Sequence, residues 1–395
     1  MESATHDPQD TGPQETGARE TGAPQAGARE TGAREVGAPQ EVGVIHDPHD
    51  VVDIRTAQAA VSTGRLPSRE AVEAALTGVL RRFRDDRRGQ VADYIPVLAA
   101  ADPDLFGVAV AHVGGTVHAA GDADHRFSIQ SISKAFVFAL VDQELGHETV
   151  RRRIGVNSTG LPFNSVLAVE LNHGRPMNPL VNAGALATTA LVPGETPEQR
   201  WEFVRRGLSR FAGRELALDP EVYASESATN QRNESIARLL DSYGALARDP
   251  VTTTDLYTRQ CSLAVSTRDL AVMGATLAGG GVNPLTGESV VAPDVCRDTL
   301  AALATAGLYE HSGDWLYEVG MPGKSGVSGG IVTVAPGKGG IAVFSPRLDD
   351  AGNSVRGQRV THHLSGALGL NLFASTPHPA AAGPAAPAPE VGFRR

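Results

Sequence analysis

Two glycine-turned stretches of alternating apolar residues, far apart in the chain, set the strongest limit on how this sequence can fold. The stretch LFGVAVAHVGGTVHAAG (105–121) predicts a hairpin that turns at Gly114–Gly115, and GGIVTVAPGKGGIAVFSP (329–346) predicts another around Pro336–Gly337. A two-stranded hairpin alone leaves an apolar face uncovered and is marginally stable in water. We therefore expect the two hairpins to join in one antiparallel sheet.

Helical spacing of apolar residues dominates the rest of the middle of the chain. A helix is expected to begin at Pro67–Ser68, and a last helix is expected over 357–368. Five more are predicted between the hairpins, in KAFVFALVDQEL, EQRWEFVRRGLSRFAG, NESIARLLDSYGAL, TRDLAVMGATLAGG and DVCRDTLAALATAG. The predicted fold class is therefore α+β, with an antiparallel sheet flanked by terminal helices and a mostly helical second lobe. The cleft between the lobes is the expected place for a functional site.

The two ends of the chain differ in composition from its middle. Residues 1–45 repeat five-residue units such as TGARE and TGAPQ, and residues 376–395 are rich in Ala and Pro. Such segments carry too little apolar surface to offset the entropy of ordering, so we expect disorder over 1–50 and 376–395. One globular domain is expected over 53–375.

Charge and cysteine content narrow the possible partners and location. The net charge is −10, but residues 1–50 contain ten acidic residues and three arginines, which account for −7 of that total. No basic face interleaved with aromatic residues is evident, so no nucleic-acid partner is expected. The chain has two cysteines, a polar and acidic N-terminus, and no run of about 18 apolar residues. We therefore expect a soluble, cytoplasmic protein with no membrane partner.

A pair of residues at the start of one predicted helix suggests chemistry. Of the 35 basic residues, only Lys134, Lys324 and Lys338 are lysines. Lys134 follows Ser131 by three positions in FSIQSISKAFVFAL (127–140), so the two side chains share one face of a helix. A buried lysine amine can act as the base that a serine nucleophile needs, whereas an arginine guanidinium stays protonated. A surface serine and a surface lysine on one helix are the structural alternative.

The second lysine lies in a second motif. Lys324, Ser325 and Gly326 come just before the strand of the second hairpin, in GMPGKSGVSGGIVTV. A Ser-x-x-Lys followed later by Lys-Ser/Thr-Gly is the two-part signature of penicillin-recognising serine enzymes. The glycines would let the backbone approach a substrate closely, and amides there could bind an oxyanion. A tight turn is the structural alternative, and Lys338 is expected at the hairpin turn with no catalytic role.

Nine segments, in order along the chain, resemble a single family. They are VADYIPVLA, FSIQSISK, NPLVNAGAL, SESATNQRN, DLYTRQCS, TLAGGGVNPLTGE, GLYEHSGDW, GMPGKSGVSGGIV and SPRLDDAGNSVRG. Through them residues 53–375 resemble the serine-dependent glutaminases of the bacterial type, which are amidohydrolases with a β-lactamase-like and penicillin-binding-protein-like fold. The resemblance implies that L-glutamine is hydrolysed to L-glutamate and ammonia, without a metal or organic cofactor, by a homo-oligomer that is a dimer or tetramer.

The resemblance also assigns roles to individual residues. It implies that Ser131 is the nucleophile, that Lys134 is its partner, and that Tyr309 relays protons to Ser131 and to the leaving ammonia. The backbone amides of Ser131 and Val327 would bind the oxyanion, and water would then resolve a γ-glutamyl ester of Ser131. The implied substrate pocket consists of Tyr94, Gln130, Ser131, Asn182, Glu226, Asn233, Tyr257, Tyr309 and Val327.

The chemistry of glutamine is consistent with these residues. Its backbone end is a zwitterion, for which Glu226 is a suitable partner of the ammonium group. Asn182, Asn233 and Tyr257 are suitable partners of the carboxylate. Each has a structural alternative, because Glu226 could be an ordinary loop acid and the two asparagines could be helix caps.

Two other functions remain open from the motifs alone. A penicillin-binding protein or β-lactamase would use both lysine motifs, but it has no evident need for Glu226 and the asparagines, and no export signal is recognisable. A glutamine sensor without turnover would use the same pocket. The presence of Ser131, Lys134 and Tyr309 together favours an enzyme over a sensor.

Overall fold

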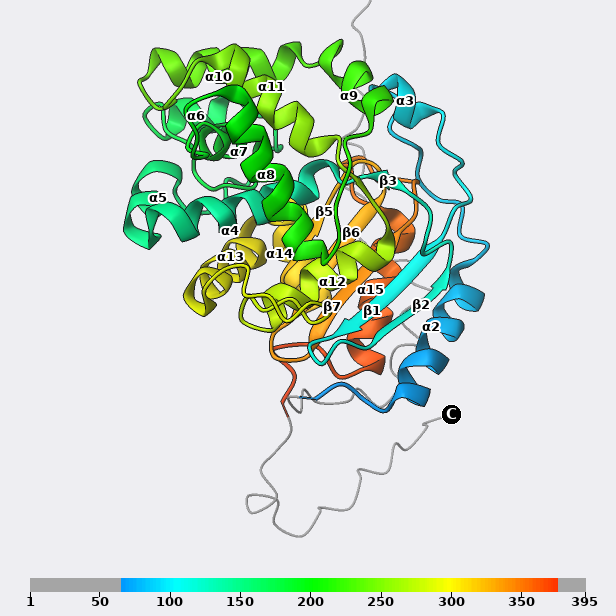
Figure 1. Cartoon of the computed structure of the whole chain (residues 1–395). Helices are drawn as coiled ribbons and strands as arrows, with labels where there is room; N and C mark the ends of the chain where they lie inside the picture. Colours follow the sequence, from blue (N-terminus) through cyan, green and yellow to red (C-terminus); the bar gives the residue numbers. More distant parts are fainter. Residues whose placement is uncertain (1–64, 376–395) are drawn as a thin grey trace, which may run out of the picture. The chain divides into compact units, whose positions relative to one another are not determined.

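The computed structural model describes residues 65–375, and their centre is an antiparallel sheet (Figure 1). Its five strands lie in the order β2-β1-β7-β6-β5 within the described residues. The two predicted hairpins meet where β1 pairs with β7, with Ala109 opposite Ala342. The prediction of one sheet is therefore confirmed. The strands are β1 (Gly107–His112), β2 (Val117–Gly121), β5 (Gly323–Ser325), β6 (Gly330–Ala335) and β7 (Gly339–Phe344).

All seven predicted helices are present in the described residues, together with shorter ones. The first begins as predicted, because the Ser68 hydroxyl accepts a hydrogen bond from the Ala71 amide at 3.3 Å. The helices are α2 (Arg69–Phe83), α3 (Pro96–Ala99), α4 (Ser133–Leu145), α5 (His147–Ile154), α6 (Leu167–Leu171), α7 (Asn182–Thr189), α8 (Pro197–Ala212), α9 (Pro220–Ser227), α10 (Gln231–Ser242), α11 (Pro250–Cys261), α12 (Thr267–Ala278), α13 (Pro293–Ala306), α14 (Ser312–Glu318) and α15 (Val355–Ala367). Smaller elements are the 3₁₀ turns η1 (Gln130–Ile132) and η2 (Tyr309–His311), and a strand pair of β3 (Phe127–Ser128) with β4 (Ala264–Val265).

Alternate residues of the sheet face two different cores. In β1, Val108 and Val110 pack in a core with residues of α2 and α15, whereas Ala109 and Ala111 belong to a larger core on the opposite face. That opposite face is covered by α12, which packs on β1, β6 and β7 (Figure 1). The terminal helices therefore cover one face as predicted, and a helix from the middle of the chain covers the other.

Two glycines allow α12 to lie unusually close to β7. A β-carbon built on Gly340 would lie 2.2 Å from the carbonyl oxygen of Ala271, and one built on Gly274 would lie 3.1 Å from the α-carbon of Gly340. The helix backbone thus rests directly on the strand backbone. This contact joins the sheet to the helical lobe that carries much of the site.

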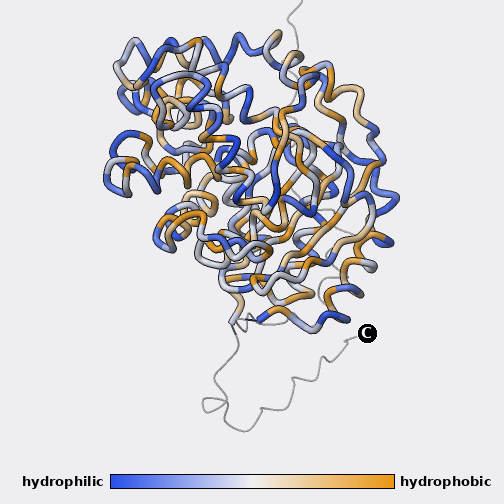
Figure 2. Tube along the Cα trace, viewed as in Figure 1, coloured by the Kyte–Doolittle hydropathy of each residue, from blue (hydrophilic) through white to orange (hydrophobic). Residues whose placement is uncertain are grey.

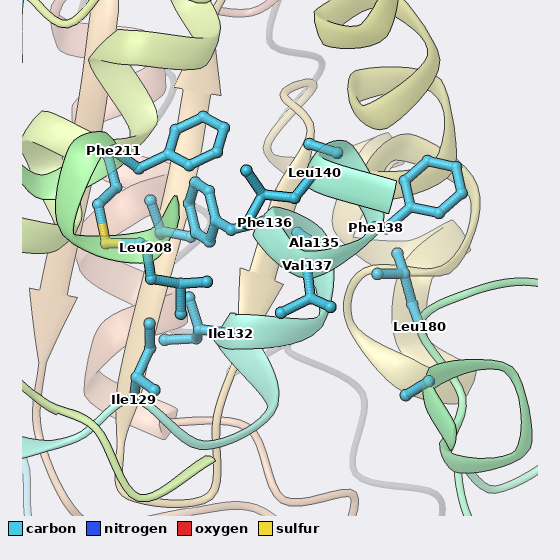
Figure 3. Close-up of a cluster of buried hydrophobic side chains, with 14 of the residues drawn as sticks. Ile129, Ile132, Ala135, Phe136, Val137, Phe138, Leu140, Leu180, Leu208 and Phe211 are labelled. Atoms are coloured by element: carbon cyan, nitrogen blue, oxygen red, sulfur yellow. The ribbon is translucent and has the colours of Figure 1, made fainter. Parts of the chain in front are cut away.

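The helical lobe is organised around α4, which is buried along most of its length. Phe136 lies on one side of α4, toward Leu208 and Phe211, and Phe138 lies on the other side, with Leu180 (Figure 3). The rings of Phe136 and Phe211 have centroids 5.1 Å apart. Hydrophobic residues follow the central strands and helices, and hydrophilic residues follow much of the outer helices (Figure 2). The helix that follows Ser131 is therefore held from several sides.

The predictions of disorder for 1–50 and 376–395 concern residues outside the described part. Within residues 65–375, none of the helices is both long enough and apolar enough to cross a bilayer.

Substitution of Gly340 tests the contact between α12 and β7. Gly340→Ala should lower the free energy of unfolding by about 1–3 kcal/mol or more, because the new methyl group collides with the helix backbone. Gly78→Ala is the matched control, since Gly78 lies inside α2 and a β-carbon added there would meet no heavy atom within 4 Å. That control should gain about 0.5–1 kcal/mol. Urea denaturation measures both, and equal midpoints for the two variants would contradict the close packing.

Candidate active site

The serine of the first motif lies in a strained turn at the start of α4. Strand β3 pairs with β4 and is followed by Gln130, whose φ is +52°, in the left-handed region that non-glycine residues rarely adopt. Ser131 comes next, buried in η1, and α4 begins at Ser133. Such a conformation costs on the order of 1–3 kcal/mol and persists where the surroundings enforce it. The predicted nucleophile is therefore presented by a turn that the surrounding structure holds in place.

Lys134 is fully enclosed one turn along from Ser131. Its amine donates to the Asn182 side-chain oxygen at 2.6 Å and to the Leu180 carbonyl at 3.3 Å. It is 1% exposed, and burial lowers its pKa to about 8. The alternative of a surface lysine is therefore wrong. A large share of Lys134 is unprotonated near pH 8, which is the state that a base requires.

Tyr309 is the third member of the predicted catalytic set, and it also has a left-handed backbone, with φ +57°. Its hydroxyl donates to the Ser325 carbonyl at 3.4 Å. Burial raises the pKa of Tyr309 to about 12, against the smaller lowering effect of hydrogen bonds with Ser131 and Ser325. The phenol is therefore protonated at neutral pH, and its hydroxyl interacts with the predicted nucleophile.

The lysine of the second motif lies behind this tyrosine. The Lys324 amine is 4.2 Å from the centroid of the Tyr309 ring. It donates to the carbonyls of Gly307 at 2.8 Å and Ser325 at 2.9 Å. Burial, with a smaller effect of nearby Lys134, lowers the pKa of Lys324 well below its usual range. Lys324 of strand β5 therefore packs against the face of the Tyr309 ring.

The third lysine is also buried, although it lies outside the site. Lys338 follows Gly337 in the turn between β6 and β7, as predicted, and its amine donates to the Gly369 carbonyl at 2.8 Å. It is 3% exposed. All three lysines of the chain are thus buried, and the amine of each donates hydrogen bonds to oxygen acceptors.

Glu226, at the end of α9, faces the serine turn. The Gln130 side-chain amide donates to the Glu226 carboxylate and also to the Ser128 hydroxyl at 3.0 Å. Burial raises the pKa of Glu226 to about 7, with the Gln130 bond opposing that shift. Glu226 is therefore a half-buried acid on a helix rather than an ordinary loop acid, in an environment suited to an ammonium group.

The two asparagines form a chain with Lys134. The Asn182 side-chain nitrogen donates to the Asn233 side-chain oxygen at 2.8 Å. The Asn182 side-chain oxygen accepts from the Lys134 amine. Neither side chain caps its helix, since Asn182 is the first residue of α7 and Asn233 lies inside α10. The helix-cap alternative is therefore wrong for both residues.

The two remaining tyrosines flank this cluster. The Lys134 amine is 5.8 Å from the centroid of the Tyr257 ring, and burial raises the pKa of Tyr257 well above its usual range. Tyr94, on the loop before α3, is 56% exposed. Partial burial of its phenol, with Tyr309 and Glu226 nearby, raises its pKa as well. Tyr94 therefore lies at the solvent side of the cluster.

Val327 lies on the connection between β5 and β6. Its side chain packs with Ile95, Leu98 and Leu348 in a small core beneath the loop of Tyr94. Within residues 65–375 its backbone N–H donates no hydrogen bond to another residue. This N–H is therefore available for the predicted role of binding an oxyanion.

One residue of the site was missed by the sequence reasoning. The ring of Phe163 lies 4.6 Å from the Tyr309 ring, between centroids, and 5.9 Å from the Lys134 amine. The Phe163 backbone carbonyl accepts a hydrogen bond from the Asn182 backbone N–H at 2.8 Å. Phe163 follows no periodic pattern, and only its place between two turn-rich stretches of the sequence could have drawn attention to it.

A large surface groove lies apart from the predicted site residues. A groove of about 1070 Å³ runs along α8 and contains none of the predicted site residues. Its charged side chains are largely paired with one another, as in the contacts of Arg205 with Glu202 and Glu215. No arrangement of three or more His, Cys, Asp or Glu side chains in residues 65–375 is suited to holding a metal ion.

Comparisons with known proteins point to one family. The family model for glutaminase matches residues 89–373. Glutaminase 2 of Yersinia pestis is 56% identical over 318 residues, which cover 80% of this chain and 94% of that protein. A glutaminase of Colwellia psychrerythraea is 47% identical over 307 residues, covering 78% of this chain and 99% of that protein.

Solved structures with the same architecture carry similar names. A probable glutaminase, ybaS, is 48% identical with a TM-score of 0.77 and covers 78% of this chain and all of its own. The Bacillus subtilis glutaminase YbgJ is 31% identical with a TM-score of 0.70, covering 76% of this chain and all of its own. The YbgJ structure is a covalent complex with 5-oxo-L-norleucine, formed by reaction with 6-diazo-5-oxo-L-norleucine. These similarities confirm the predicted α+β fold class.

The half-buried carboxyl of Glu226 predicts a pH-dependent cost to stability. Its pKa rises from 4.5 to about 7 on folding, so the free energy of unfolding falls as pH increases from about 4.5 to about 7. Glu226→Gln keeps an acceptor for Gln130 but cannot ionise. It should therefore raise Tm by about 2–4 °C at pH 8 and by little at pH 5, as measured by calorimetry. Glu221→Gln, an exposed change on the same helix, is the control, and an equal gain at both pH values for Glu226→Gln would contradict the assignment.

Proposed function

The chain is a member of the glutaminase family of hydrolases, and we propose that it hydrolyses the side-chain amide of L-glutamine to L-glutamate and ammonia through a serine acyl-enzyme intermediate. The proposal assigns this activity to residues 53–375. The observation that carries it is the enclosed Lys134 amine, with a pKa of about 8, one helical turn after Ser131, whose side chain interacts with the buried Tyr309 hydroxyl.

In the first half of the reaction, the Ser131 hydroxyl attacks the carbon of the side-chain amide. Its proton passes to the pair formed by Lys134 and Tyr309, because a large share of Lys134 is unprotonated near pH 8 and the Tyr309 hydroxyl interacts with Ser131. The amide C=O becomes a tetrahedral oxyanion. The C–N bond then breaks, and the departing nitrogen takes a proton from the same pair to leave as ammonia.

The oxyanion is bound by the backbone N–H groups of Ser131 and Val327. The free N–H of Val327 and the position of Ser131 in η1, directly before α4, support this role. Removing one such donor typically slows turnover by about 10²–10³-fold. The donors act on charge that develops in the transition state, and they therefore chiefly increase kcat.

In the second half, water replaces ammonia. The Lys134 and Tyr309 pair removes a proton from water, which attacks the γ-glutamyl ester carbon. The ester C–O bond breaks, the Ser131 oxygen recovers its proton, and L-glutamate leaves. The covalent complex of YbgJ with 5-oxo-L-norleucine supports a nucleophile in a related protein.

The polar residues around the serine suit the backbone end of glutamine. Glu226 pairs with the α-ammonium, which favours its ionised form and offsets the burial that raises its pKa. Asn182, Asn233 and Tyr257 bind the α-carboxylate, and Gln130 and Tyr94 complete the pocket. Buried groups that are left unpaired by an incomplete analogue cost several kcal/mol, so the site selects for free glutamine.

The proposal extends to the environment and assembly of the protein. It includes a cytoplasmic location, a homo-oligomer (dimer or tetramer), and a reaction that needs no cofactor. The two cysteines, Cys261 and Cys296, are unpaired and buried, which is consistent with a reducing compartment.

Replacement of the nucleophile is the direct test of the mechanism. Ser131→Ala should lower glutamate release by about 10⁴-fold or more while Tm changes little, because the attacking oxygen is lost. The unaltered enzyme should gain the mass of one 5-oxo-norleucine group on reaction with 6-diazo-5-oxo-L-norleucine, and Ser131→Ala should gain none. Near-normal turnover by a folded Ser131→Ala would sink the proposal. If the enzyme hydrolysed a chromogenic β-lactam quickly and glutamine slowly, that result would favour the penicillin-recognising alternative.

Replacement of a lysine by arginine tests whether a neutral amine is needed. Lys134→Arg should lose about 10³-fold in kcat/KM, since guanidinium does not lose its proton near neutral pH. In the unaltered enzyme kcat/KM should rise between pH 6 and pH 8.5, as Glu226 and then Lys134 lose their protons. Lys338→Arg, at a buried lysine outside the site, is the matched control and should keep kcat/KM within about 3-fold. Should Lys134→Arg fail to fold, Lys134→Met serves as the second variant. An active, folded variant of Lys134 would exclude the role as base.

A further inference from the structure

We propose that Ser133 is a positioning residue which, together with Gln260, holds the peptide between Gln130 and Ser131 and so aims the Ser131 N–H at the reacting oxygen. The inference rests on the acyl-transfer mechanism proposed above. Neither residue belongs to the predicted pocket. Both are buried, with Ser133 0% exposed and Gln260 1% exposed.

The Ser133 side chain closes the strained turn. Its hydroxyl donates to the Gln130 carbonyl at 2.8 Å, and its backbone N–H donates to the same oxygen. Gln130 is the residue with φ +52°. A carbonyl held by two donors of one residue cannot rotate without breaking both bonds, so Ser133 stabilises the left-handed conformation.

Gln260 on α11 determines which way the Ser133 hydroxyl points. The Gln260 side-chain nitrogen donates to the Ser133 oxygen at 3.3 Å, and the Thr189 hydroxyl donates to the Gln260 side-chain oxygen at 3.2 Å. A hydroxyl has one proton, and Ser133 donates it to the Gln130 carbonyl at 2.8 Å. This direction follows because Gln260 supplies a donor and the Cys261 sulfur, 3.9 Å away, is a weaker partner. Thr189 fixes the amide so that its nitrogen faces Ser133. The three residues form a directed chain that ends at the Gln130 carbonyl.

The planar peptide transmits this constraint to the catalytic atom. The carbonyl of Gln130 and the N–H of Ser131 belong to one trans peptide unit and point in opposite directions. Fixing the oxygen therefore fixes the N–H, which is the expected oxyanion donor. An oxyanion donor acts only when it is placed in advance within hydrogen-bond distance of the developing charge.

The second expected donor is held against the same turn. A β-carbon built on Gly326 would lie 3.1 Å from the Ile129 carbonyl oxygen and 3.2 Å from the Gln130 β-carbon. The backbone just before Val327 therefore packs directly on the turn. A shift of the Gln130 peptide would change the distance between the two donors, so Ser133 controls the width of the oxyanion site as well as its direction.

Kinetics of two variants and a matched control test this role. Ser133→Ala should lower kcat by about 10–100-fold and leave KM within about 3-fold, because the lost alignment matters only when the oxyanion forms. Gln260→Met should lower kcat by about 3–10-fold, since the hydroxyl remains but is no longer oriented. The double variant should be no slower than Ser133→Ala, because both changes break one chain. Ser262→Ala is the control, with a fully buried serine bonded to the Thr258 carbonyl at 2.9 Å, and should keep kcat within about 2-fold.

The outcomes separate this inference from the mechanism on which it rests. A folded Ser133→Ala with kcat within 3-fold of normal, or losses that multiply in the double variant, would overturn the positioning role. So would a loss in Ser262→Ala equal to that in Ser133→Ala, which would indicate general damage to the core. If Ser133→Ala does not fold, Gln260→Met alone decides, and unchanged kcat counts against the proposal. Activity in Ser131→Ala would instead remove the acyl-enzyme mechanism itself.

Discussion

The burial of the Lys134 amine without a carboxylate partner is the constraint on which the site depends. In the described residues its hydrogen-bond partners are a side-chain amide oxygen and a backbone carbonyl, and both are neutral. A carboxylate there would have stabilised the ammonium form and raised the pKa. Neutral acceptors satisfy the donors while desolvation lowers the pKa to about 8. The apolar packing of α4 encloses the amine, and Asn182 links it to the part of the pocket assigned to the carboxylate of glutamine.

The sheet brings together the parts that this amine serves. Ser131 comes from η1, Lys134 from the start of α4 and Tyr309 from η2. Lys324 comes from β5, which reaches β1 only through β6 and β7. Lys324 and Ser131 then act on Tyr309 from different sides, one at the ring face and one at the hydroxyl. Residues far apart in the chain thus depend on the pairing of the two hairpins for their mutual distances. The packing of α12 on β7 fixes the position of the paired hairpins relative to the helical lobe.

Much of this arrangement could be predicted from the sequence, for identifiable reasons. The hairpins were predicted because alternation and turn glycines are local signals, and the cap at Ser68 is local as well. The packing of α12 on the sheet was not predicted. The apolar residues of a helix indicate that it is buried, but they do not indicate which element it packs against. The turn at Gln130 escaped notice because its φ of +52° results from tertiary contacts and not from residue type. Asn182 suited a cap and a ligand equally, and only its bond to Lys134 separates the two. The roles of the individual site residues still depend on the proposed chemistry.

The enclosure of all three lysines has a consequence for the outer surface of the protein. Lys134, Lys324 and Lys338 are each 3% exposed or less, so the positive charge on the described surface is carried by arginine and histidine. Acetylation, ubiquitination and amine-reactive cross-linkers all require an accessible primary amine, and the folded domain offers no lysine side chain for them. The α-amino group is the remaining amine of the chain. A reagent that does modify a lysine therefore reports opening of the core and not a property of the native surface.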